Sequence, residues 1–368
     1  MYFENVKKNL GFGCMRLPML SGEVDFEHFS KMIDRFMEEG FNYFDTAHGY
    51  ISGKSETAIR ECLAKRYPRD SYILTDKLTE NYFDSESDIR PFFETQLECC
   101  GVEYFDFYLM HAQNARNYIK FKKCRAYETA AKLKEEGKIR HVGISFHDKA
   151  DVLDMILSEQ PAIEVVQIQF NYFDYDDPGV QSRLCYEVCR KHGKPVIVME
   201  PVKGGSLVNL PDNAAEVFSA LGDKSPASYA IRFAAGFEGI MMVLSGMSNI
   251  DQMNDNIGYM KDFIPLSDKE LEAVKKVNGL FHTIQLVQCT SCRYCVEGCP
   301  KNIAIPDVFS CLNTYRRFKD KQSWRYNNII KERGKASDCI KCGKCEKVCP
   351  QALPIRELLA ECAGVYDK

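Results

Sequence analysis

Eight of the 17 cysteines in this 368-residue chain lie in two matching runs near its end. Each run has the pattern Cys-x-x-Cys-x-x-Cys-x-x-x-Cys-Pro, and the runs begin at Cys289 and Cys339. Three thiolates spaced in this way can bind three irons of one [4Fe-4S] cubane, while the fourth cysteine of a run usually binds the cluster of the other run. The spacing therefore predicts two [4Fe-4S] clusters. The expected ligands are Cys289, Cys292, Cys295 and Cys349 for the first cluster, and Cys339, Cys342, Cys345 and Cys299 for the second.

A zinc site or a disulfide framework fits these cysteines less well. Structural zinc takes four ligands from paired CxxC motifs, which leaves the third cysteine and the Cys-Pro pair of each run unexplained. Disulfide frameworks are typical of short secreted chains, whereas this chain is long and opens without an apolar signal segment. The cysteines outside the runs have no such spacing, and we expect them to be small buried apolar side chains.

A second set of reactive side chains closes apolar runs in the first two thirds of the chain. Asp45 ends FNYFD, Lys77 ends YILTDK and His111 ends FYLMH, while Tyr50 follows Asp45 by five residues. A phenol with a pKa near 10 is a poor proton donor at neutral pH unless a neighbouring cation lowers that pKa. We expect Lys77 to be this cation for Tyr50, with Asp45 orienting and charge-balancing it. His111 would polarise a substrate carbonyl oxygen or share proton transfer with Tyr50.

Each of these four residues also has a plain structural explanation. Asp45 fits a turn cap, Tyr50 and Lys77 fit solvated rim positions, and His111 fits a satisfied core imidazole. As a set they predict a catalytic site only if the elements that carry them bring them to one place.

Those elements repeat as a short apolar strand followed by an amphipathic helix. Several of the helical stretches end in glycine, which closes a helix in the left-handed conformation. Repeated βα units that close on themselves form a (β/α)8 TIM barrel, whose chemistry sits where strands end. A doubly wound open sheet is the alternative, but the GxGxxG loop that usually follows its first strand is absent. Eight strands are expected to begin near Leu10, Phe41, Tyr72, Phe105, His141, Val165, Pro195 and Ile240.

The chain is expected to divide into three parts. Residues 1–266 form the barrel, and residues 267–288 form a linking helix that opens with a capping box from Ser267 to Glu270. Residues 289–368 form the iron–sulfur domain, in which the long segment between Cys299 and Cys339 has a helical pattern. The expected fold class is therefore α/β, a TIM barrel followed by a small, mainly α-helical ferredoxin-like domain.

The barrel resembles the aldo-keto reductase family in the segments LGFGCMRLP, FDTAHGY, FYLMH and VVQIQFNYFD. This resemblance implies hydride transfer between a nicotinamide cofactor, NAD(P)(H), and a small carbonyl or alcohol substrate. It places Asp45, Tyr50, Lys77 and His111 at the family's catalytic positions. The cysteine runs resemble those of bacterial-type ferredoxins, and with them the chain resembles the iron–sulfur branch of that family.

The resemblance also implies cofactor contacts along the later strands. Phe146 stands where the family has an asparagine, and Met199 stands where it has an aromatic ring that stacks on the nicotinamide. The family's cations that bind the 2′-phosphate of NADP correspond to Gly246 and Gln252 here, and Lys203 is a weak substitute for them. The sequence therefore leaves both NAD and NADP as candidate cofactors. The contacts implied by the resemblance are Ser145, Gln167, Met199 and Asn256. Residues 248–252 are expected to open a helix whose free backbone N–H groups face a phosphate, which adds Ser248 and Gln252.

Charge and hydropathy restrict the partners. The net charge of −4 combines 15 Lys and Arg against 9 Asp and Glu in residues 289–368 with 33 against 43 in residues 1–288. The basic tail can balance anionic clusters, so we expect no nucleic acid partner. No stretch is apolar enough to span a membrane, which predicts a cytoplasmic protein that contacts no membrane.

Three functions fit these features. The first is a carbonyl reductase or alcohol dehydrogenase whose clusters relay electrons to or from a ferredoxin-like partner. The second is a non-catalytic electron carrier or redox sensor whose barrel binds a nucleotide or a partner. In the third the clusters are structural. A hydride carries two electrons and a cubane passes one at a time, and the sequence shows no recognisable flavin motif to link them.

Overall fold

The structure is a computed structural model that describes residues 3–289, 292–349 and 351–367. It divides into two compact units. One unit consists of residues 1–208 and 223–274, and the other of residues 209–222 and 275–368. Among the described helices, none is long and apolar enough to cross a membrane.

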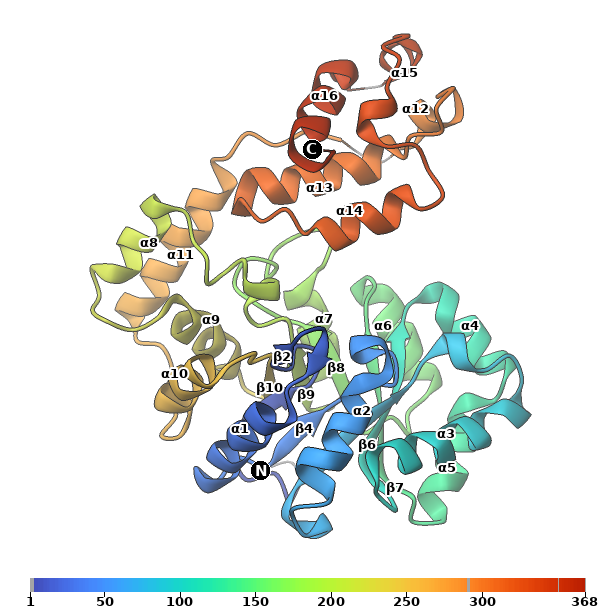
Figure 1. Cartoon of the computed structure of the whole chain (residues 1–368), viewed down its shortest axis with the longest axis vertical. Coiled ribbons are helices and arrows are strands. Elements are labelled where there is room, and N and C mark those ends of the chain that lie inside the picture. The colour runs from blue at the N-terminus through green and yellow to red at the C-terminus, as the bar shows by residue number, and fades with distance from the viewer. Residues whose placement is uncertain (1–2, 290–291, 350, 368) are drawn as a thin grey trace. The chain divides into compact units, whose positions relative to one another are not determined.

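The first unit is a closed barrel of eight parallel strands (Figure 1). Neighbouring strands follow the chain order, and the barrel closes where the first strand pairs with the last. Each strand begins within two residues of its predicted start, so the sequence-based prediction of a (β/α)8 barrel is confirmed. The strands are β1 (Leu10–Gly13), β4 (Tyr43–Asp45), β5 (Ile73–Leu78), β6 (Phe105–Gln113), β7 (Ile139–Phe146), β8 (Val165–Gln169), β9 (Val196–Met199) and β10 (Ile240–Ser245). A small antiparallel pair, β2 (Met19–Leu20) and β3 (Glu23–Val24), follows β1.

Helices surround the barrel, and some of their ends carry capping groups. Asp25 accepts a hydrogen bond from the backbone N–H of His28 at the first helix, and Gly101 ends the third with a φ of 68°. The helices of this unit are α1 (Phe26–Glu38), α2 (Lys54–Ile59), α3 (Glu86–Cys100), α4 (Ala115–Lys123), α5 (Ala126–Glu135), α6 (Ala150–Glu159), α7 (Ser182–Lys191), α9 (Pro226–Ala235) and α10 (Ile250–Met260).

Alternate residues of each strand face two different cores. Tyr43, Ile73, Phe107, Val165 and Ile197 pack together inside the barrel, whereas their sequence neighbours pack in the layer between strands and helices. Because side chains alternate along a strand, every second residue after these five also faces the interior. The interior positions at the carboxyl ends of the strands are therefore Asp45, Lys77, His111, Gln167 and Met199.

The second unit is mainly helical and has its own apolar core. Helix α13 (Ile305–Phe318) packs against the last helix of the chain, α16 (Ile355–Tyr366). The rings of Tyr326 and Tyr366 stack with their centroids 4.5 Å apart. The predicted helical C-terminal domain is thus confirmed, and the capping box between Ser267 and Glu270 starts the helix that leads to it. The helices are α8 (Asp212–Ser219), α11 (Asp268–His282, shared between the units), α12 (Tyr294–Glu297), α13 (Ile305–Phe318), α14 (Ser323–Ile330), α15 (Lys344–Lys347) and α16 (Ile355–Tyr366).

Candidate functional site

Lys77 is the centre of a polar cluster at the carboxyl ends of β4 and β5. Its Nζ lies 2.7 Å from Asp45 Oδ1, 2.7 Å from the carbonyl oxygen of Thr46 and 3.2 Å from the Tyr50 hydroxyl. The side chain is fully buried, so these oxygens replace the water that an ammonium group needs. Burial lowers the pKa of Lys77, whereas the charges and hydrogen bonds of Asp45 and Tyr50 raise it. The raising effects are together larger, so the pKa of Lys77 lies above its ordinary value.

Tyr50 opens a short 3-10 turn after β4, and its ring is half-buried. Burial raises the pKa of its hydroxyl, the Lys77 ammonium lowers it, and the Asp45 carboxylate raises it again. The net pKa of Tyr50 lies above its ordinary value. The sequence-based prediction that Lys77 makes this phenol acidic is therefore wrong in its net direction, because it left out burial. The phenol is protonated at neutral pH, which is the form that a proton donor requires.

His111 lies beside Tyr50 with the two rings edge to face and their centroids 6.2 Å apart. Its Nδ1 is 2.6 Å from the hydroxyl of Thr79. Burial, together with the charges of Lys77 and His147, lowers the pKa of His111 to about 3, so the imidazole is neutral. The structure therefore brings all four sequence-predicted residues to the same end of the barrel, three in hydrogen-bond contact and His111 against the ring of Tyr50.

Two of the predicted nicotinamide contacts lie on the strands that follow. Ser145 and Gln167 are paired across β7 and β8, and both are buried. The Ser145 hydroxyl oxygen accepts the backbone N–H of Ala112 at 2.8 Å, and the Gln167 amide donates to Asp45 Oδ2 at 3.2 Å. Met199 ends β9 and is half-buried. Phe146 packs in the layer outside the barrel, so its side chain does not face the barrel interior.

The three other predicted contacts lie between β10 and α10. Gln252 Oε1 accepts the backbone N–H of Ser248 at 2.8 Å, while the Asn249 side chain accepts that of Gln252 at 2.9 Å. Asn256 is buried, donates to Ser245 at 2.7 Å and accepts the Tyr259 hydroxyl at 2.5 Å. The start of α10 is thus capped by its own side chains, and two N–H groups expected to face a phosphate already have partners.

Two cations near these strand ends differ in how their charges are balanced. Lys203 forms an ion pair with the buried carboxylate of Asp174 through contacts of 2.7 and 2.8 Å. Arg16, whose side chain adjoins Gly246, donates to the carbonyl oxygen of Gly204. Among the described residues, no carboxylate pairs with Arg16, so its charge is available to an anionic group at this end of the barrel.

Sequence reasoning missed a pair of buried acids behind Lys77. Asp76 faces away from the barrel interior, and the amide of Gln96 donates to both Asp76 Oδ1 at 3.1 Å and Glu56 Oε1 at 3.3 Å. Burial raises the pKa of Glu56 to about 7, and burial together with the charge of Glu56 raises the pKa of Asp76. Glu56 Oε2 contacts His48 Nδ1 at 2.7 Å, which links the pair to the mouth of the barrel. The available signal was an acidic residue directly before Lys77 in the buried run YILTDKL.

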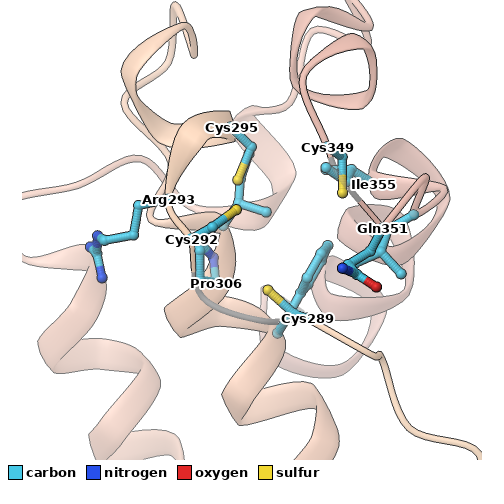
Figure 2. A pocket seen from close by; sticks show the side chains of 11 residues that line it. Cys289, Cys292, Arg293, Cys295, Pro306, Cys349, Gln351 and Ile355 are labelled. Atoms are coloured by element: carbon cyan, nitrogen blue, oxygen red, sulfur yellow. The ribbon is translucent and has the colours of Figure 1, made fainter.

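The two cysteine runs line two cavities. Figure 2 shows the sulfur atoms around the first cavity facing a common space. Ile305 lines both cavities, and the other walls are largely apolar. The first cavity is lined by Cys289, Cys292, Cys295 and Cys349, and the second by Cys299, Cys339, Cys342 and Cys345.

Each cavity therefore contains three cysteines of one run and the last cysteine of the other, which is the arrangement expected from the spacing. Four converging thiolates are soft ligands that suit an iron–sulfur cluster. Apolar walls limit the access of water to such a group. The donor set and the surroundings thus fit one [4Fe-4S] cluster in each cavity.

The barrel, its strand-end polar site and the paired cysteine cavities define a redox protein of two domains. A sequence profile of the Aldo/keto reductase family matches residues 9–279, and a profile of a 4Fe-4S dicluster domain matches residues 288–353. The chain belongs to the aldo/keto reductase family and carries a C-terminal two-cluster domain, and it is an oxidoreductase.

Similar proteins agree with this assignment. The "Uncharacterized oxidoreductase YqkF" of Bacillus subtilis is 23% identical over 72% of this chain and 91% of its own length. The "9,11-endoperoxide prostaglandin H2 reductase" of Trypanosoma cruzi is 24% identical over 66% of this chain and 80% of its own. The holo form of aldo-keto reductase AKR11C1 from Bacillus halodurans superposes with a TM-score of 0.60 at 24% identity, covering 74% of this chain and 92% of that one. At this identity the structural likeness establishes the fold alone.

Proposed function

We propose that the barrel interconverts a small carbonyl compound and its alcohol with NAD(P)(H), and that Tyr50 is the group that donates and accepts the proton. The observation that carries this proposal is the buried Lys77 Nζ held between Asp45 at 2.7 Å and the Tyr50 hydroxyl at 3.2 Å. An ammonium in this position stabilises the phenolate that remains after Tyr50 gives up its proton. The bound nicotinamide would supply the hydride.

His111 would hold the substrate oxygen against Tyr50. When the Thr79 hydroxyl donates to Nδ1, the other ring nitrogen carries the proton and can donate to a carbonyl oxygen. Its pKa of about 3 keeps the ring neutral, so it polarises the oxygen without adding a second charge beside Lys77. Ser145 and Gln167 would bind the carboxamide of the nicotinamide, because both present polar atoms on the interior face of neighbouring strands.

Relatives support a nicotinamide cofactor of either type. One is named NADH-specific methylglyoxal reductase, from Escherichia coli, and one solved aldo-keto reductase, from Klebsiella pneumoniae, is in complex with NADPH. In this chain Lys203 is neutralised by Asp174, whereas Arg16 pairs with no carboxylate among the described residues, so Arg16 would contact the phosphates. The two clusters would relay electrons, one each, between the protein and a ferredoxin-like one-electron partner.

The test is replacement of Tyr50 by Phe in the protein loaded with both clusters. We expect carbonyl reduction to fall by roughly 10²- to 10⁴-fold, the usual contribution of general acid catalysis, while the iron–sulfur absorbance is unchanged. Full activity of this variant would disprove the role of Tyr50. The chief alternative is an electron carrier or redox sensor without hydride transfer, for which Met199 in place of a stacking ring is the motive. That alternative predicts no oxidation of NADH or NADPH with any of a broad panel of carbonyl compounds.

A further inference from the structure

Positive charge in the iron–sulfur domain is concentrated beside one of its two cavities. The segment 331–347, which contains most of the second run, has six Lys and Arg against three Asp and Glu. Lys301 and Lys344 line the second cavity, and Lys341 lies between two of its cysteines. These three lysines are exposed, and among the described residues none forms an ion pair with them.

The first cavity has no such surplus. Residues 288–300 contain Arg293 and Glu297 as their only charged residues. Arg293 lines the cavity, and its charge is balanced by Asp307 Oδ2 at 3.0 Å. Two clusters of the same type carry similar charges, so neutralising them would call for cations beside both. Neutralisation alone therefore does not explain the unpaired lysines at the second cavity.

An exposed apolar side chain lies among these lysines. Ile340 also lines the second cavity and is 57% exposed, although isoleucine is usually buried. Cys342, two residues later, is exposed as well. Protein interfaces typically combine an apolar centre with a polar rim, and those of electron-transfer complexes are small. We call the surface formed by Lys301, Ile340, Lys341 and Lys344 the lysine face.

We propose that the lysine face docks an acidic one-electron carrier protein, and that electrons pass between this carrier and the cluster held by Cys299, Cys339, Cys342 and Cys345. The proposal rests on the electron-relay part of the proposed function. In the reducing direction the carrier loses one electron and the cluster gains it, with no bond made or broken. Complementary charge would steer the carrier to this cavity, where a thiolate ligand is exposed.

The experiment is anaerobic stopped-flow reduction of the oxidised, cluster-loaded full chain by a reduced acidic [2Fe-2S] ferredoxin. No carbonyl compound or nicotinamide is present, so the result does not depend on Tyr50 or on hydride transfer. The test variant carries Lys301→Glu, Lys341→Glu and Lys344→Glu. The matched control carries Lys7→Glu, Lys123→Glu and Lys269→Glu, exposed positions of the barrel unit that change the net charge equally.

We expect the second-order rate constant for bleaching of the clusters to fall with rising salt, and to fall at least about tenfold in the test variant at low ionic strength, because steering charges act on association. Reduction by methyl viologen radical, a small molecule that needs no docking surface, should proceed at similar rates in all three proteins. This second measurement shows that the clusters of the test variant are intact.

Three results would overturn the proposal. The first is a rate constant that is the same in the test variant and the natural chain. The second is an equal loss in the control variant, which would show a general effect of net charge. The third is an RNA oligomer that blocks reduction of the natural chain and has no effect on the test variant at matched ionic strength, because the lysine face would then be a nucleic acid site.

Discussion

Lys77 is the residue on which the other polar groups of the barrel interior depend. It touches Asp45, Thr46 and Tyr50, and it is fully buried. Asp45 is buried too, and burial raises its pKa, whereas the charge and hydrogen bond of Lys77 lower it. Removing the cation therefore leaves a carboxylate with only the Gln167 amide at 3.2 Å as a side-chain partner among the described residues.

The Lys77→Met variant should be destabilised by about 3–5 kcal/mol, the usual cost of leaving one member of a buried ion pair alone. Its carbonyl reduction should also fall, because the phenolate of Tyr50 loses its stabilising charge. Urea denaturation and steady-state kinetics measure the two effects. The double variant Asp45→Asn with Lys77→Met is the control, since it removes both charges. It should recover part of the stability and none of the activity, and equal stability of the single and double variants would contradict the ion-pair argument.

Glu56 should make the stability of the barrel depend on pH. Its pKa is raised from 4.5 to about 7 by burial, against hydrogen bonds to Asp76, Gln96 and Cys99 that lower it. The folded protein therefore holds a proton that the unfolded chain releases, and the stabilisation present below pH 4.5 is lost as the pH rises to about 7. Glu56→Gln removes this ionisation. Between pH 5 and 8, the free energy of unfolding should therefore fall by on the order of 1–3 kcal/mol less in this variant than in the natural chain. Urea denaturation across this pH range provides the measurement, and parallel curves for the two proteins would refute the assignment.

The sequence predicted the residues of the site better than their electrostatics. The cysteine spacing and the strand-end positions depend on local sequence, which is why Asp45, Tyr50, Lys77 and His111 could be selected from the order of residues alone. The pKa of Tyr50 depends on how deeply its hydroxyl is buried, and the pairing of Glu56 with Asp76 joins segments that are distant in sequence. Neither property can be derived from the spacing of residues.

At the level of secondary structure, alternation along the strands accounts for the site. Asp45 follows Tyr43 by two residues, and Lys77 follows Ile73 by four. The side chains of Asp45 and Lys77 therefore face the barrel interior, as those of Tyr43 and Ile73 do. Buried parallel strands are nearly continuous apolar runs, and for this reason their positions could be predicted. The mutual capping of Ser248, Asn249 and Gln252 could not be predicted from the sequence. Capping and phosphate binding use the same N–H groups at the start of a helix, so the sequence alone does not distinguish them.

Gly143 in β7 is where neighbouring strands leave no room for a side chain. A Cβ atom there would lie 2.5 Å from Val165 Cγ1 and 2.6 Å from the carbonyl oxygen of Val165. Gly143→Ala should therefore destabilise the barrel by about 1–3 kcal/mol through overpacking. The control is Gly258→Ala in α10, where nothing lies within 4 Å of the added atom. That change should stabilise the protein by about 0.5–1 kcal/mol, because alanine is the better helix former. Thermal unfolding of both variants gives the comparison, and a neutral Gly143→Ala would show that β7 and β8 can separate at no cost.

For the molecule as a whole, the net charge is the sum of two parts of opposite charge. Residues 289–368 are basic and residues 1–288 are acidic, with 15 Lys and Arg against 9 Asp and Glu in the first and 33 against 43 in the second. From its motifs, the sequence predicts that the barrel ends at residue 266 and that the cluster domain begins at residue 289. It contained no sign that residues 209–222, which include α8, group with the second unit, because that grouping depends on tertiary contacts between distant segments.

The exchange of the last cysteines between the two runs predicts a specific pattern of cluster loss. Cys349 belongs to the second run but lines the first cavity with Cys292, whereas Cys342 lines the second. Cys349→Ser and Cys292→Ser should therefore each impair the same cluster, and the double variant should lose no more iron than the more affected single variant. Combining Cys349→Ser with Cys342→Ser should impair both clusters.

Iron analysis and low-temperature electron paramagnetic resonance of the dithionite-reduced variants distinguish the two clusters. A magnetic interaction between two reduced clusters should disappear in Cys349→Ser and in Cys292→Ser, leaving the same single-cluster spectrum in both. If Cys349→Ser instead gave the spectrum of Cys342→Ser, each run would hold its own cluster, because the ligand lost would then belong to the second cavity. The lysine face would still adjoin the second run in that case, since Lys341 and Lys344 lie within that run.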